Sequence, residues 1–87
     1  MASFNYDPIE KQFEQLLTTV TGTFTNAELK EVRDFLEVGE YGLALQTFID
    51  IVKEESKRIP IGACSTVREL ATLMDLSDEI DMKIFLR

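Results

Sequence analysis

The most regular hydrophobic pattern in the chain lies between residues 41 and 52. Apolar side chains recur there at intervals of three and four positions, which places them on one face of an α-helix. Ile49 widens this stripe, and Leu43 and Ile51 add apolar surface on its flanks. A helix that is apolar over so much of its circumference is normally buried in a bundle. We therefore expect residues 40–56 to form the most buried helix, with a stripe of Tyr41, Ala44, Leu45, Phe48 and Val52.

A glycine lies near the start of this helix. Gly42 costs roughly 1 kcal/mol there relative to alanine, so we expect a neighbouring helix to approach its backbone closely. Polar side chains form one clear ridge along the same helix, made of Gln46, Asp50, Lys53 and Lys57.

Three further helices are predicted by similar spacing. The first starts at Asp7-Pro8-Ile9-Glu10, where an N-cap residue precedes a proline and an acid. Thr25 and Glu28 predict a capping box at the start of the second helix, which runs to a sharp turn at Gly39. Pro60 and a loop over residues 61–64 precede another capping box at Thr66 and Glu69. The inward positions are Ile9, Phe13, Leu16, Leu17 and Val20, then Leu29, Val32, Phe35 and Leu36, then Val67, Leu70, Ala71 and Met74.

These elements predict an all-α protein, a single compact bundle of four to five short helices in one domain, residues 1–87. Ser77 is expected to cap a final short helix, and Phe24 to be a loop residue inserted into the core. No continuous apolar run reaches the length of a membrane span. The first residues lack the basic and apolar regions of a secretory signal, and one cysteine excludes an internal disulfide. We therefore expect a cytoplasmic protein.

The stretch from Val32 to Phe48 also carries a family resemblance. The residues concerned are Val32-x-x-Phe35-Leu36-x-x-Gly39-Glu40-Tyr41-Gly42-Leu43-Ala44-Leu45-x-x-Phe48. This run resembles the signature of small helical immunity proteins of the MafI family, which accompany bacterial polymorphic toxins, including contact-dependent growth inhibition systems. Gln46 stands where that family would have an acidic residue. The resemblance implies a scaffold of helices and a cognate toxin as partner.

The charge of the chain is −7, from sixteen acids and nine bases. It is concentrated in residues 1–50, which hold nine acids and three bases and carry a net charge of −6. Such a surface disfavours nucleic acid, which needs clustered Lys and Arg, and disfavours anionic membranes. It suits a basic protein partner, although acidity also serves solubility alone.

Residues for catalysis are scarce. The chain has no histidine, which removes the commonest general base and metal ligand. Cys64 has no evident activating partner in sequence and is interpreted as a structural thiol, while Ser65 and Thr66 are interpreted as helix caps. We expect no enzyme activity, no cofactor and no metal site.

Two functional classes remain. The first is an immunity protein that binds the C-terminal domain of a cognate toxin, of basic, nuclease class, as a monomer in a 1:1 complex. The second is a non-catalytic acidic adaptor or carrier-like module, for which Ser65 and Ser77 are the candidate attachment sites. For the first class we expect the binding surface on the solvent-exposed faces of the first two helices. These faces are expected to form one surface, because consecutive helices tend to pack side by side. Its residues are Glu31, Asp34, Glu37 and Glu40, with Asp7, Glu10 and Glu14 beside them and Tyr6 or Tyr41 as an aromatic anchor.

Overall fold

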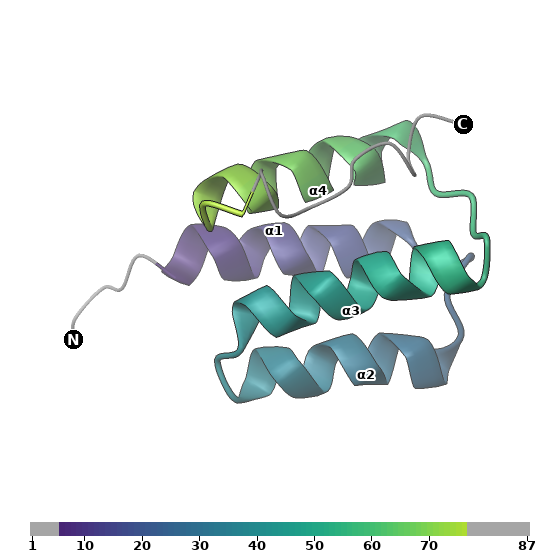
Figure 1. The fold of residues 1–87 in the computed structure, drawn as a ribbon, viewed down its shortest axis with the longest axis horizontal. Coiled ribbons are helices and arrows are strands. Elements are labelled where there is room, and N and C mark those ends of the chain that lie inside the picture. The colour runs from purple at the N-terminus through teal and green to yellow at the C-terminus, as the bar shows by residue number, and fades with distance from the viewer. Residues whose placement is uncertain (1–5, 77–87) are drawn as a thin grey trace.

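A computed structural model describes residues 6–76, with side chains from residue 8 onward. Four α-helices account for most of this part of the chain, and it contains no strand (Figure 1). The all-α prediction is therefore confirmed. The helices are α1 (Tyr6–Thr19), α2 (Asn26–Glu37), α3 (Tyr41–Glu54) and α4 (Ile61–Leu73).

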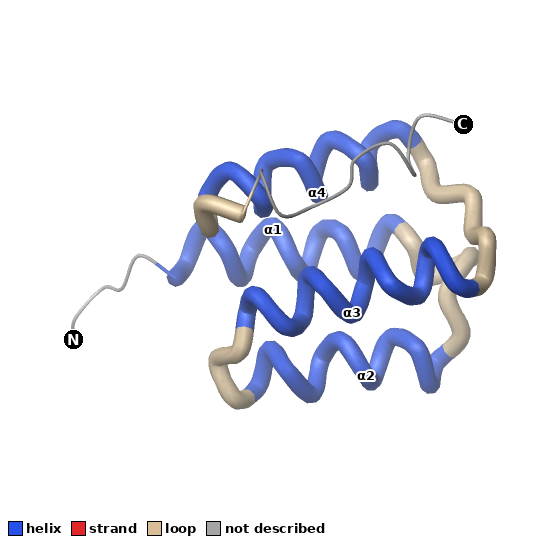
Figure 2. Tube along the Cα trace, in the orientation of Figure 1, coloured by secondary structure: helices blue, strands red, loops and turns tan. Residues whose placement is uncertain are grey.

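The helices pack chiefly in two pairs. α1 lies against α4 and α2 lies against α3, with a smaller contact between α3 and α4. Short connections join helices that run in alternating directions, as the tube in Figure 2 shows. The expected side-by-side packing of α1 and α2 is therefore not among the main helix contacts. Their polar faces nevertheless border a common groove, which is described below.

A single core joins the two pairs. α1 contributes Phe13, Leu16 and Leu17, and α2 contributes Val32. Phe24, from the α1–α2 connection, stacks on Phe48 with 4.8 Å between ring centroids, which confirms its predicted insertion into the core. α3 supplies the largest set of buried side chains of any helix in the described range, which confirms its central place. These are Ala44, Leu45, Phe48, Ile49, Ile51 and Val52.

The start of α2 is fixed by the predicted capping box. The Glu28 backbone N–H donates to the Thr25 hydroxyl oxygen at 3.1 Å, and the Thr25 N–H donates to the Glu28 carboxylate at 2.9 Å. Lys57 adds a tertiary tie to this box: its Nζ lies 3.1 Å from that carboxylate and donates to the Thr23 carbonyl at 3.0 Å. The ammonium also lies 5.4 Å from the centroid of the Phe24 ring. The α1–α2 connection is thereby fastened to the end of α3.

Lys57 had been assigned to the exposed polar ridge of α3, and that assignment was wrong. α3 ends at Glu54, and Ser56 adopts a positive φ of 51°. The chain then reverses, so the side chain of Lys57 points inward and is 14% exposed.

The start of α4 was also predicted incorrectly. The helix begins at Ile61, directly after Pro60, and not at Thr66. Thr66 is buried within the helix, where its hydroxyl donates to the Gly62 carbonyl at 3.0 Å. Ser65 is likewise inside α4 and is not a cap. α1 begins at Tyr6, one residue before the predicted N-cap.

Gly42 does not mark a close helix approach. Among the residues that the structure describes, a Cβ added at this position would meet only the Leu76 side chain, at 3.8 Å, which is ordinary van der Waals contact. The turn glycine is Gly39, whose φ is +77°. The final helix predicted from Ser77 lies outside the described residues, as do the side chains of Tyr6 and Asp7.

Candidate functional site

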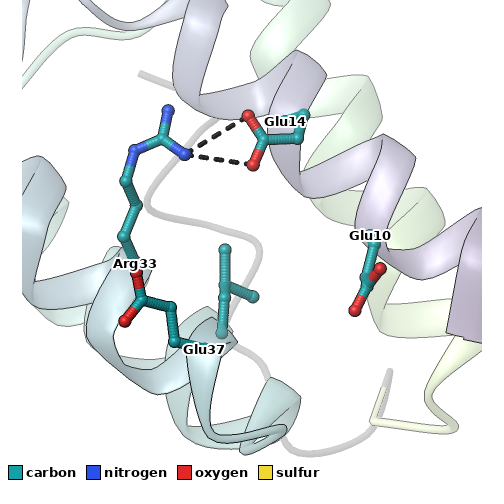
Figure 3. A pocket seen from close by; sticks show the side chains of 5 residues that line it. Glu10, Glu14, Arg33 and Glu37 are labelled. Atoms are coloured by element: carbon teal, nitrogen blue, oxygen red, sulfur yellow. Dashed lines mark hydrogen bonds and ion pairs between the residues drawn. The ribbon is translucent and has the colours of Figure 1, made fainter.

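A groove between α1 and α2 collects the largest share of the predicted binding residues. Its volume is about 370 Å³, and residues from both helices line it (Figure 3). Glu10 and Glu14 stand one helical turn apart on α1, while Arg33 and Glu37 stand one turn apart on α2. Half-buried Leu36 supplies apolar surface between them.

An ion pair crosses this groove. Arg33 Nη1 donates to both carboxylate oxygens of Glu14, at 3.0 and 3.3 Å (Figure 3). The two side chains remain 44% and 61% exposed. Nothing in the sequence placed Arg33 at this surface, because a contact across 19 positions leaves no periodic signal. Leu36 was expected to face inward, and its place at the groove was likewise not anticipated.

Tyr41 ties the first turn of α3 to α1. Its hydroxyl donates to Glu10 Oε2 at 2.5 Å, and its ring stacks on Phe13 with centroids 6.4 Å apart. A short hydrogen bond to a carboxylate is among the stronger polar contacts in proteins. The side chain of Tyr41 is half-buried. Its hydrogen bond holds the Glu10 carboxylate in place at the edge of the groove. Whether it also contacts a partner stays a prediction.

The remaining predicted acids are dispersed. Asp34 pairs with Lys30 at 3.0 Å on the outer side of α2. Glu31 is exposed roughly 120° around the helix from Glu37, since each residue advances by about 100°. Glu40 is exposed at the N-cap of α3, where its side chain makes no capping hydrogen bond. The structure thus brings together Glu10, Glu14 and Glu37, but not Glu31, Asp34 or Glu40.

A second groove lies between α1 and α4. It has a volume of about 440 Å³, and half-exposed Leu73 is one of its apolar lining residues. Its wall carries one guanidinium and one carboxylate, so it has no strong charge preference. The lining residues are Pro8, Gln12, Arg68, Glu69, Thr72 and Leu73.

The groove between α1 and α2 offers ion pairing and hydrogen bonding. Three carboxylates and one guanidinium around an apolar side chain suit a cationic side chain with an aliphatic stem.

The only thiol of the chain is on α4, away from these residues. Burial raises the pKa of Cys64, and the charge of Arg68 partly offsets this effect. A raised pKa disfavours the thiolate, which is the nucleophilic form.

Within residues 6–76, no three His, Cys, Asp or Glu side chains are arranged to hold a metal ion. In the same range, no helix has the length and apolar character needed to cross a bilayer.

Comparisons with known proteins give no relative. No protein-family model matches the chain, and no curated protein or solved structure matches it either.

Proposed function

We propose that this chain is a cytoplasmic immunity protein that binds a basic toxin domain and has no catalytic activity of its own. The observation that carries the proposal is the groove between α1 and α2, where Glu10, Glu14 and Glu37 gather from two helices. The resemblance of residues 32–48 to MafI-family immunity proteins gives the class of partner.

A toxin of nuclease class would fit this surface for an electrostatic reason. A nuclease must present a basic surface to phosphate, and a groove lined with carboxylates is complementary to it. The net charge of −7 accelerates encounter with such a partner. In a 1:1 complex the groove either covers the substrate-binding surface of the toxin or occupies a site next to it.

The carrier-like alternative has lost one of its two attachment candidates. A prosthetic-group serine is needed at the start of a helix, whereas Ser65 lies inside α4. Ser77 lies outside the described residues.

The first test is genetic and biochemical. The product of the adjacent gene, co-expressed with this chain, should copurify with it, and its toxicity should disappear when this chain is present. A neighbouring product that neither binds this chain nor is neutralised by it would contradict the proposal.

The second test places the partner on the surface. Glu37→Lys should slow association with the toxin, because it reverses a charge within the groove. Glu31→Lys makes the same charge change on the same helix but on another face, and serves as the matched control. Equal association rates for the two variants would show that net charge, and not the groove, guides binding.

If a groove carboxylate is buried against a toxin arginine, its truncation should cost about 2–5 kcal/mol of binding free energy.

A further inference from the structure

The groove between α1 and α2 already contains a guanidinium, and it belongs to the chain itself. Arg33 reaches from α2 to Glu14 on α1, 19 positions earlier, and binds both of its carboxylate oxygens (Figure 3). The other cation near this part of α2, Lys30, instead pairs with Asp34 on the outer side of the helix. Among the described residues that line the groove, Arg33 is the one cation.

This contact is suited to exchange. Both partners are substantially exposed, at 44% and 61%, and exposed ion pairs contribute little net stability because water and salt screen them. Another cation can therefore replace Arg33 on Glu14 at small cost. The helices themselves are held by the core and by the Tyr41–Glu10 hydrogen bond, so losing the pair leaves the groove walls in place.

We propose that the Arg33–Glu14 pair is an autoinhibitory contact. The guanidinium occupies the place that an arginine of a basic partner takes, and it moves off Glu14 when that partner binds. With Arg33 present, the three carboxylates and one guanidinium of the lining within residues 6–76 have a formal charge of −2; without it, the charge is −3. The partner class rests on the function proposed above, whereas the exchange itself is a property of the groove.

The test uses a hexa-arginine peptide as the probe, titrated into the full chain at low ionic strength and followed by amide chemical shifts. Arg33→Met removes the guanidinium and keeps an aliphatic stem. Lys30→Met is the matched control, because it removes one positive charge and one exposed ion pair from the same helix outside the groove. We expect Arg33→Met to bind the peptide about two- to five-fold more tightly than Lys30→Met, the range that corresponds to an exposed ion pair. The shifts should centre on Glu10, Glu14, Leu36 and Glu37.

Three results would overturn the inference. Equal affinities of the two variants would mean that net charge alone matters. Weaker binding by Arg33→Met would mean that Arg33 helps to bind the peptide. Absence of any shift at the groove in wild type and variants would mean that the groove does not accept arginine. Circular dichroism checks that each variant is folded, and Arg33→Gln replaces Arg33→Met if the latter loses helicity.

These results are separable from the fate of the proposed function. The peptide titration needs no toxin, so the exchange can hold even if no neighbouring gene product is neutralised. Conversely, a toxin bound elsewhere on the molecule would support the immunity function and leave the peptide result negative.

Discussion

Gly39 has a φ of +77°, in the left-handed region where an L side chain is strained. It follows the end of α2. Its N–H donates to the Leu36 carbonyl at 3.1 Å, and the N–H of Glu40 donates to the Phe35 carbonyl at 2.9 Å. These two bonds satisfy carbonyls that the last turn of a helix leaves open. The turn that leads from the acidic helix into the central helix therefore depends on this glycine.

Substitution of the two nearby glycines should separate backbone strain from packing. Gly39→Ala should lower the free energy of unfolding by about 1 kcal/mol, because a Cβ meets no atom of residues 6–76 within 4 Å and the cost is conformational. Gly42→Ala should raise it by about 0.4–1 kcal/mol, since the helical backbone and the space beside Leu76 accept a methyl group. Urea unfolding measures both. A loss of stability in Gly42→Ala would instead support the close approach of a neighbouring helix that the sequence predicted.

Glu28 should make stability depend on pH. The hydrogen bond from the Thr25 N–H, with the nearby Lys57 ammonium, holds the pKa of Glu28 below its usual value, against the opposing effect of burial. The folded state therefore favours the carboxylate. The resulting stability is complete above the unfolded-state pKa of about 4.3 and is lost as pH falls through the lowered folded-state value.

The variant Glu28→Gln tests this dependence. Wild type should be more stable than Glu28→Gln at pH 7, and the difference in unfolding free energy should shrink toward pH 3. Glu31→Gln, an exposed site on the same helix, controls for the change in net charge. If wild type and Glu28→Gln differ in unfolding free energy by the same amount at pH 7 and at pH 3, the charge of the Glu28 carboxylate does not contribute to stability.

At the scale of the helix, the sequence predicted what local chemistry encodes. The three-to-four spacing identified the buried faces, and Thr25 with Glu28 identified the start of α2. The end of α3 and both ends of α4 lack such signals. α3 and α4 are followed by Ser56 and Asp75, which adopt positive φ values of 51° and 58° without being glycine. Pro60 precedes α4 with no capping side chain, so residues 61–64 were predicted as a loop and not as the first turn of the helix.

Two variants of α3 test whether its buried face carries the fold. Phe48 is fully buried and stacks on Phe24, so Phe48→Ala should cost about 3–5 kcal/mol. Leu43 is 50% exposed on the same helix, so Leu43→Ala should change stability by about 0.5 kcal/mol or less. Thermal or urea unfolding compares them. Wild-type-like unfolding of Phe48→Ala would contradict the central position of α3.

At the scale of the whole molecule, composition indicated an acidic surface but not its shape. Glu10, Glu14 and Glu37 converge because the two helix pairs bring α1 and α2 to either side of a groove. Glu31 is on another face of α2, which the acid spacing alone did not separate from the rest. Arg33 could not have been placed opposite Glu14 from sequence, because the pair depends on how the helices cross and not on their periodicity.

The charge of the molecule gives a last prediction, which concerns binding to the basic partner proposed above. Attraction between exposed charges weakens as salt shortens the Debye length from about 10 Å at 0.1 M to about 3 Å at 1 M. Rising salt should therefore lower the association rate strongly and change the dissociation rate much less. Stopped-flow mixing across that range measures both rates. Glu37→Lys should give a shallower salt dependence than Glu31→Lys, since it removes attraction where the partner docks. A salt-independent association rate would show that the net charge of −7 does not guide encounter and serves solubility alone.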